Sequence, residues 1–518
     1  MQNYIINSIF NSQLSIFYYL CTKICKKTII LKTIIRFLLL FMLSLNASAQ
    51  SPKHEVRAVW LTTIGGIDWP RAHSAATQKL ELTRTLDQLQ RAGINTVLLQ
   101  TRVRASVIYP SAIEPWDMCL TGRHGQSPGY DPLQFCIDEC HRRGMELHAW
   151  VVTLPIGKLT EQRFKDFARK NPALVKRIGD SGYMNPEDAR TGDYLARICT
   201  EITRNYDIDG IHLDYIRYPE TWKMKVSRQQ GRQYITNIVR KIHHAVKELK
   251  PWVKLSCSPI GKHDDLLRYR AGGWNAYTAV CQDAQGWMRQ GLMDQLYPMQ
   301  YFRDNHYFPF AIDWQEQSCG RTVSSGLGIY FLSPSEGKWL LSDVTRQLNA
   351  CRQIGIGHCF FRTKFLTDNW KGIYDYVCRF NAVPALVPPM TWAAAKAPQA
   401  PANLQVSRTA KSDRLTWNGV ESTPHLLYNI YASQDYPVDT DNPANLIAMR
   451  QTGTELTVPH SGKRLNYAVR ATDRYGNESA AVGSQPEQRL FPKVLSPLDT
   501  SIPPFYYQNA KQKKKKKK

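Results

Sequence analysis

The sequence predicts a (β/α)8 TIM barrel followed by a small all-β sandwich domain. Short apolar, β-prone runs alternate with helix-like stretches up to about residue 380, as parallel strands and their crossover helices do. The chain of 518 residues has room for a barrel of roughly 250 residues or more and one further small module. Beyond residue 400 the apolar residues alternate in short runs bounded by turns, which is typical of a β-sandwich.

Eight runs supply the predicted barrel strands. They lie at residues 56–63, 95–104, 145–153, 207–219, 253–258, 293–301, 322–330 and 357–362. The segment before the second run repeats Leu82, Leu86 and Leu89 at near-helical spacing and stops at Gly93, so a helix connects the first two strands. Because this order recurs along the chain, we assign residues 53–380 to the barrel.

The run at residues 207–219 is the most informative of the eight. Side chains alternate along a strand, so Gly210, His212 and Asp214 share one face, and we expect that polar face to point into the barrel. Asp214 is the last inward residue and lies at the C-terminal mouth, where such barrels hold their sites. It is therefore the first catalytic candidate, and the alternative is a structural ion pair with Arg217.

The second strand places Gln100, Arg102 and Arg104 on one face, which we also expect to point inward. Two guanidinium groups held close together need an anion beside them. That anion is either a catalytic carboxylate, Asp214 or Glu114, or a carboxylate of the substrate, and we favour the first. Glu114 lies in the long loop after this strand among aromatic residues; the alternative for the loop is a solvated segment ordered by its prolines.

Nine short motifs occur in a specific order and spacing. They lie at residues 57–62, 100–104, 109–111, 115–116, 120–122, 129–132, 148–150 and 185–186, and at 209–219, where the sequence is Asp-Gly-Ile-His-Leu-Asp-Tyr-Ile-Arg-Tyr-Pro. In these motifs the chain resembles the glycosyl-hydrolase-like 10 family of exported bacterial proteins. The resemblance implies a TIM barrel that hydrolyses glycosidic bonds, with peptidoglycan glycan strands as the substrate assigned to some members.

A glycosidase of this kind needs two carboxyl groups, one as the acid and one as the nucleophile or base. We predict that Asp214 is one of them and that Glu114 is its partner. Glu114 is preferred over Asp68, Asp294 and Asp304 because neighbouring aromatic side chains would raise its pKa toward that of a general acid. The rival hypothesis is a non-catalytic envelope protein that binds carbohydrate on the same barrel scaffold.

Further residues are predicted to bind the substrate. Arg102, Arg104, His148, His212 and Gln300 would bind hydroxyl groups or charged substituents, and Trp116, Tyr297 and Tyr301 would stack on sugar faces. Packing at the barrel mouth is the alternative for each aromatic residue. No zinc-type spacing of Cys and His occurs, so we expect neither a metal nor a cofactor.

The N-terminal residues 1–49 are predicted to be an export signal. They carry no acidic residue, five basic ones and an apolar run that ends in Ala47-Ser48-Ala49, a small-x-small cleavage pattern. The mature protein would begin near Gln50 and reside in the periplasm or outside the cell, with no stable membrane span after the signal is removed. The alternative is an uncleaved anchor.

The chain is strongly basic, with a formal net charge of +24. Five of these charges lie in the export segment and seven in the Lys-rich end, which leaves +12 on the body. A basic exported protein suits a polysaccharide or glycan-strand substrate or another anionic envelope surface, and we expect no nucleic-acid partner.

The C-terminal part divides into three predicted segments. Residues 381–400 are rich in Pro and Ala and predict a stiff linker. Residues 401–486 resemble fibronectin type III domains and contain no Cys, which disfavours a disulfide-pinned immunoglobulin domain. We expect this domain to contact an envelope protein or polymer. Residues 487–518 predict a disordered basic tail.

Overall fold

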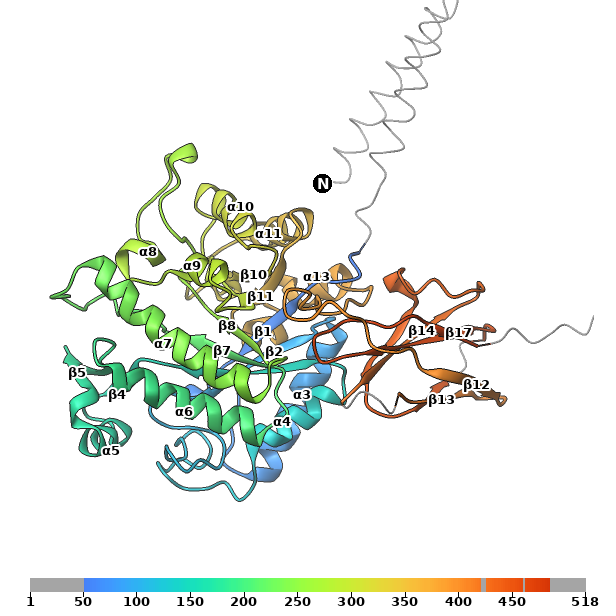
Figure 1. Cartoon of the computed structure of the whole chain (residues 1–518), viewed down its shortest axis with the longest axis horizontal. Coiled ribbons are helices and arrows are strands. Elements are labelled where there is room, and N and C mark those ends of the chain that lie inside the picture. The colour runs from blue at the N-terminus through green and yellow to red at the C-terminus, as the bar shows by residue number, and fades with distance from the viewer. Residues whose placement is uncertain (1–50, 421–424, 460–461, 485–518) are drawn as a thin grey trace, which may run out of the picture. The chain divides into compact units, whose positions relative to one another are not determined.

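The computed structural model describes residues 51–420, 425–459 and 462–484, which form two compact units divided between Ala395 and Lys396 (Figure 1). The predicted signal peptide and the predicted basic tail lie outside the described residues. Each unit has its own hydrophobic core.

The first unit contains a closed barrel of eight parallel strands, which confirms the predicted fold class. The strand order around the barrel is β1-β11-β10-β9-β8-β7-β3-β2. These strands are β1 (Arg57–Leu61), β2 (Thr96–Arg102), β3 (Glu146–Val152), β7 (Gly210–Asp214), β8 (Lys254–Cys257), β9 (Gln295–Leu296), β10 (Thr322–Leu327) and β11 (Gly357–Phe360). Each of them falls inside one of the eight predicted runs.

Helices cover the outside of the barrel, and Figure 1 shows α6 and α7 side by side. The helices are α3 (Ala75–Arg91), α4 (Pro132–His141), α5 (Gln162–Lys170), α6 (Ala189–Asn205), α7 (Arg228–Leu249), α8 (Ala276–Ala279), α9 (Ala284–Arg289), α10 (Phe308–Glu316), α11 (Leu341–Gln353), α12 (Thr363–Thr367) and α13 (Ile373–Phe380). Ile211 and Leu213 of β7 pack with Ile198 and Val239 of these helices in the outer core. His212, between them in sequence, points into the barrel, because Trp60 of β1 donates a hydrogen bond to it. The predicted alternation along β7 is therefore observed.

A small antiparallel sheet follows the C-terminal end of β3. Its strands are β4 (Pro155–Lys158), β5 (Val175–Ile178) and β6 (Ser181–Met184), in the order β4-β6-β5, and α5 lies between β4 and β5 in sequence. Gly157 pairs with Gly182 in this sheet, and a Cβ on Gly182 would lie 2.2 Å from the Phe164 ring of α5. This close approach fixes α5 against the sheet beside the barrel mouth.

The Pro-rich segment after α13 packs against the N-terminal end of the barrel, so the predicted linker is shorter than residues 381–400. Leu386 exchanges backbone hydrogen bonds with Lys53 and Glu55, and Arg57 donates to the Val383 carbonyl at 2.7 Å. Met390 is fully buried. Proline lacks an amide proton but keeps its carbonyl, so a Pro-rich segment can still pair along one edge and bury its side chains.

The second unit is an all-β domain built from two antiparallel sheets. One sheet contains β12 (Ala402–Arg408), β13 (Ser412–Asn418) and β16 (Glu455–Pro459), and the other contains β14 (Leu427–Ser433), β15 (Leu446–Gln451), β17 (Asn466–Thr472) and β18 (Val482–Gly483). Leu415 and Trp417 of the first sheet share a core with Ile430 and Val469 of the second. This is the predicted sandwich, and its likeness to fibronectin type III domains stays a prediction.

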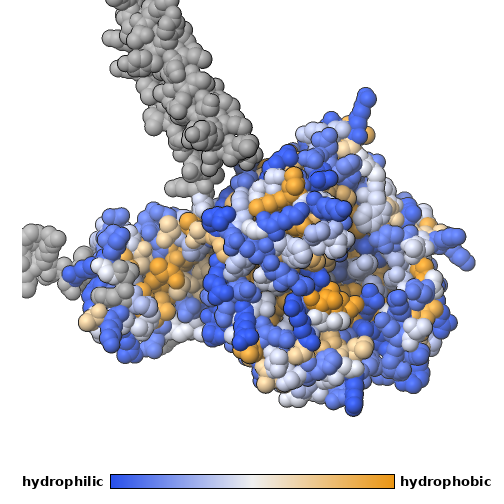
Figure 2. Space-filling view, turned by 180° about the vertical axis from the view of Figure 1, so that it is seen from behind, coloured by the Kyte–Doolittle hydropathy of each residue, from blue (hydrophilic) through white to orange (hydrophobic). Residues whose placement is uncertain are grey.

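Hydrophilic residues cover most of the face shown in Figure 2, and hydrophobic residues gather there in separate patches. Among the helices of the described part of the chain, none combines the length and apolar character needed to cross a bilayer. The same part of the chain contains no cluster of three or more His, Cys, Asp or Glu side chains arranged to hold a metal ion.

Candidate active site

Asp214 lies at the C-terminal end of β7 and is fixed by three donors, one directly after β7 itself and one from each of the two flanking strands. The Ser258 hydroxyl, after β8, donates to Oδ1 at 2.8 Å, and the backbone N–H of Tyr215 donates to the same oxygen at 2.8 Å. Trp150 of β3 donates from Nε1 to Oδ2 at 3.1 Å. The carboxyl group is therefore held in one orientation at the barrel mouth.

The environment of Asp214 raises its pKa above the usual range of an aspartate. Burial causes this shift, and the hydrogen bond from Ser258 and the charge of Arg217 oppose it. The residue is 7% exposed, so it keeps limited access to the mouth. A carboxyl group with a raised pKa keeps its proton to a higher pH than an ordinary aspartate does, which is the property that a general acid needs.

His148, His212 and Tyr297 lie below Asp214 in the packed interior of the barrel and are fully buried. Trp60 Nε1 donates to His212 Nε2 at 3.2 Å, and His212 Nδ1 lies 3.0 Å from the Ser256 hydroxyl. Burial lowers the pKa of His212 well below its ordinary value, so its ring is neutral. Side chains fill the interior of a small barrel, so these three predicted substrate-binding residues serve packing instead.

Arg102 points out of the barrel, contrary to the predicted parity. A β-bulge between Gln100 and Arg102 shifts the register, so that Arg102 lies opposite Val151, a residue of the outer core. Its guanidinium forms two hydrogen bonds to the Glu114 carboxylate, from Nε at 2.8 Å and from Nη2 at 2.7 Å. It also donates from Nη1 to the carbonyl of Thr153 at 2.8 Å.

Glu114 therefore lies between the barrel and α6 rather than across the mouth from Asp214. The Tyr194 hydroxyl of α6 donates to Glu114 Oε1 at 3.0 Å, and the pair of Arg102 and Glu114 is almost completely buried. Both carboxylate oxygens are bound by protein groups. The structure does not bring together the two carboxyl groups that the sequence predicted, and Glu114 acts as the anion that holds Arg102.

Two other predicted residues also lie away from the mouth. Trp116 packs against the outer hydrophobic core. Gln300 is fully buried and accepts a hydrogen bond from the Ser325 hydroxyl at 2.8 Å. Neither side chain is placed to contact a ligand beside Asp214.

Arg104 and Tyr301, in contrast, lie at the mouth with Asp214. The Arg217 guanidinium lies 4.5 Å from the centre of the Tyr215 ring, directly after Asp214. Arg104 follows the C-terminal end of β2, and the next residue, Ala105, donates from its backbone N–H to the Ile156 carbonyl of β4 at 3.5 Å. The Tyr301 hydroxyl is buried without a hydrogen-bond partner among the described residues. Burial raises its pKa, and the charge of Asp214 adds to the effect.

The loop after β7 adds a second carboxylate that the sequence prediction missed. Arg217 Nη1 lies 2.9 Å from Glu220 Oε1, and the Glu220 side chain is 45% exposed. The Arg217 guanidinium lies 4.5 Å from the centre of the Tyr215 ring and 6.0 Å from that of the Trp274 ring. The signal for Glu220 in the sequence is its position directly after the strand that ends in Asp214, three residues beyond Arg217.

The remaining acidic candidates are engaged by other partners. Asp294 precedes β9 at the N-terminal end of the barrel and pairs with Lys247 at 2.6 Å. Asp304 is exposed and pairs with Arg346 at 3.3 Å. Asp68 forms an ion pair with Arg362 and accepts hydrogen bonds from the backbone of Thr62 and Lys364. Compared with these three candidates, Glu220 lies beside Arg217 and Tyr215, which are also neighbours of Asp214.

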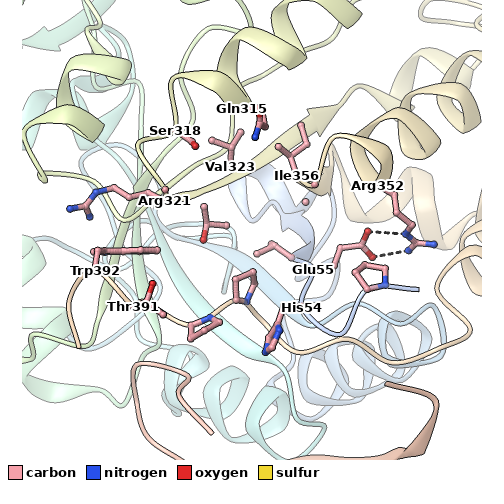
Figure 3. A pocket seen from close by; sticks show the side chains of 18 residues that line it. His54, Glu55, Gln315, Ser318, Arg321, Val323, Arg352, Ile356, Thr391 and Trp392 are labelled. Carbon is pink, nitrogen blue, oxygen red and sulfur yellow. Dashed lines mark hydrogen bonds and ion pairs between the residues drawn. The ribbon is translucent and has the colours of Figure 1, made fainter. Parts of the chain in front are cut away.

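A separate pocket of about 220 Å³ opens at the opposite end of the barrel (Figure 3). Its wall includes Glu55, which forms two hydrogen bonds with Arg352, and Trp392, over whose ring the Arg321 guanidinium lies at 5.1 Å. These residues surround the N-terminal ends of the strands, where side chains contribute to stability in such barrels. The pocket is therefore not our candidate for the chemistry.

The described part of the chain therefore contains a TIM barrel with a buried carboxyl group and aromatic rings at its C-terminal mouth. Residues 55–234 and 227–330 match the model of the family described as glycosyl hydrolase-like 10, and the chain belongs to this family, as its motifs predicted.

Curated relatives agree with this assignment. The chain is 30% identical over 505 residues to "Glycosyl hydrolase YngK" of Bacillus subtilis (strain 168), covering 89% of this chain and 99% of the relative. It is 30% identical over 296 residues to "Glycosyl hydrolase DigH" of Escherichia coli (strain K12), covering 49% of this chain and 67% of that protein. Among solved structures, α-L-fucosidase isoenzyme 2 from Paenibacillus thiaminolyticus is 14% identical, with a TM-score of 0.42, over 64% of this chain and 49% of the other.

Proposed function

We propose that this protein is an exported glycoside hydrolase that cleaves glycosidic bonds in a bacterial envelope polysaccharide, with peptidoglycan glycan strands as the favoured substrate. The observation that carries the proposal is the Asp214 carboxyl group, buried at the barrel mouth with a raised pKa. Membership of the glycosyl hydrolase-like 10 family and the names of the two relatives support it. Export to the periplasm or the cell exterior is part of the same proposal.

In this proposal Asp214 is the general acid. It protonates the glycosidic oxygen as the bond to the anomeric carbon breaks, and the proton leaves with the departing sugar. Glu220 is the second carboxyl group, which attacks the anomeric carbon or activates the water that does so. Its ion pair with Arg217 and its exposure to solvent leave it able to turn toward a sugar at the mouth.

The alternative function is a carbohydrate-binding protein without catalysis. One observation favours it, because Glu220 forms an ion pair with Arg217 and is not fixed inside the mouth as Asp214 is. Release of reducing ends from purified glycan strands separates the two functions. The hydrolase generates new reducing ends with time, whereas the binding protein retains strands in a pulldown and leaves their number of ends unchanged.

Replacing Glu220 by Gln is expected to lower kcat on glycan strands by about a hundredfold, because a positioned base contributes that much. Reducing-end release measures this effect. The matched control is Glu248→Gln on α7, a carboxylate with 64% of its side chain exposed, beside His244. Unchanged kcat in Glu220→Gln would remove Glu220 from the mechanism and return attention to Asp68.

Removing residues 396–518 is expected to leave hydrolysis of short soluble oligosaccharides unchanged, because Asp214, Glu220 and Arg217 all belong to the first unit. Retention on insoluble envelope polymer should fall, since we propose that the all-β domain contacts a polymer or a neighbouring envelope protein. Co-sedimentation and soluble-substrate assays on the same preparations test both parts. Loss of soluble-substrate turnover in a truncated chain whose barrel still unfolds cooperatively on heating would contradict this division of roles.

A further inference from the structure

The two arginines at the mouth differ in their partners. Arg217 forms an ion pair with Glu220. Arg104 forms no ion pair or hydrogen bond through its side chain within the described residues, although Arg102, two positions earlier, is fully paired. An arginine charge without an anion beside it is available to a ligand.

The backbone at Arg104 is held in a position that side chains rarely adopt. Arg104 has φ of 69°, in the left-handed region, directly after the end of β2. The turn is closed by a hydrogen bond from Val103 N–H to the Ser106 carbonyl at 2.7 Å. A non-glycine residue in this conformation is strained, so the backbone here is held by its surroundings and not by the preference of the residue itself.

The surroundings of Arg104 place it beside the candidate catalytic residues. The backbone N–H of Ala105, next to Arg104, donates to the Ile156 carbonyl of β4 at 3.5 Å, and the neighbouring Pro155 pairs with Tyr183 of β6. In agreement with this placement, burial raises the pKa of Tyr183 and of Tyr215, and the charge of Arg104 opposes both shifts. The backbone N–H of Tyr215 donates to Asp214 at 2.8 Å. Arg104 therefore lies over the same part of the mouth, next to the small sheet that borders it.

Arg217 offers a second unused donor at this place. The residue is 4% exposed, and its Nε has no hydrogen-bond partner within the described chain. Leaving a buried donor on a charged group unpaired is unfavourable, and an oxygen atom supplied by a ligand would satisfy it. Arg104 and Arg217 together could engage a group with two or more negatively charged oxygens.

We propose that Arg104 and the free Nε of Arg217 form a subsite for a negatively charged substituent, a carboxylate or a phosphate, on the sugar bound beside Asp214. The inference rests on the proposed function and names the residue that selects the charge of the substrate. Arg104 has no part in breaking the glycosidic bond. It determines specificity by holding an anionic group at the mouth.

The test is a binding measurement that does not depend on hydrolysis. Asp214→Asn in the full chain serves as the parent, and calorimetry gives its Kd for matched ligands: an oligosaccharide with free carboxylates and its methyl ester, and a phosphorylated oligosaccharide and its dephosphorylated form. We expect the parent to prefer one of the two anionic ligands about tenfold or more over its neutral match. The pair that shows the preference identifies the anionic group.

Adding Arg104→Gln is expected to reduce this preference to less than about threefold while the Kd of the neutral ligand stays unchanged. Arg104→Lys should keep part of it, because lysine keeps the charge but not the planar fork. Arg142→Gln, directly after α4, replaces an arginine with 61% of its side chain exposed and is the control that should keep the full preference. Thermal unfolding of each variant verifies that it is folded.

Two results would overturn the subsite: an equal preference in the parent and in Arg104→Gln, or no preference in the parent. These results are distinguishable from failure of the proposed function. An unmutated protein that releases no reducing ends, with a charge preference that depends on Arg104, would reject the hydrolase and keep the subsite. Hydrolysis of neutral and anionic strands at equal kcat/KM by both the unmutated protein and Arg104→Gln would reject the subsite alone.

Discussion

Replacing Asp214 by Asn is expected to lower the turnover of glycan strands by about a thousandfold or more, because the amide cannot supply the proton that the leaving sugar requires. The fold should persist, since the amide oxygen can still accept from the Ser258 hydroxyl and the Tyr215 N–H. Reducing-end release at saturating substrate is the measurement. Asp138→Asn, an exposed position of α4, is the matched control.

The dependence of kcat and of stability on pH provides a second test of the role of Asp214. Burial raises the pKa of Asp214, so the acid form persists above the usual pH range of a carboxyl group, and kcat should fall as pH rises through that raised pKa. The folded state also binds this proton more tightly than the unfolded chain does. Stability due to Asp214 is therefore present at low pH and declines as pH rises between its unfolded and folded pKa values.

Asp214→Asn removes that decline, so at neutral pH the variant should unfold at the same or a higher temperature than the unmutated protein while losing activity. A residue kept at a cost to stability is expected at a functional site. Equal activity in the variant and the unmutated protein would eliminate Asp214 as the acid. A large drop in melting temperature would show that the carboxyl group is structural, as the ion-pair alternative with Arg217 requires.

The sequence was sufficient to place the barrel strands and Asp214, because both depend on local periodicity. Residues two apart on a strand share a face, and β7 keeps this rule from Gly210 to Asp214. The same rule failed on β2, where a single bulge after Gln100 inverts the face of Arg102. Nothing in the local pattern of residues 95–104 marks an inserted residue, although one inserted residue reverses all later parities.

The residues that surround Arg104 and Arg217 come from loops that meet only in the folded chain. Trp274 approaches Arg217 from the loop after β8, and the small sheet after β3 meets the end of β2, where Ala105 donates to the Ile156 carbonyl at 3.5 Å. Such contacts follow from the order of strands around the barrel, which composition does not reveal. The Pro-rich segment after Asn381 shows the same limitation, since its composition predicts a linker while its carbonyls and Met390 pack against the barrel.

The pair of Arg102 and Glu114 gives the largest expected effect on stability. Glu114→Gln should lower the free energy of unfolding of the barrel by about 3–5 kcal/mol, because it leaves the Arg102 charge buried without a counterion. Arg102→Met should cost at least as much, since Thr153 also loses the donor to its carbonyl. Urea denaturation of each variant gives these values.

A double replacement, Arg102→Met with Glu114→Gln, separates the charge effect from the packing effect. Removing both charges eliminates the uncompensated one, so the double variant should be more stable than the sum of the two single losses predicts. Per folded molecule, all three variants should keep the KM of the unmutated protein for neutral and acidic glycans, because Arg102 lies between the barrel and α6 rather than at the mouth. A raised KM for acidic glycans alone would instead mean that Arg102 contacts the substrate, and the β-bulge would then not explain its direction.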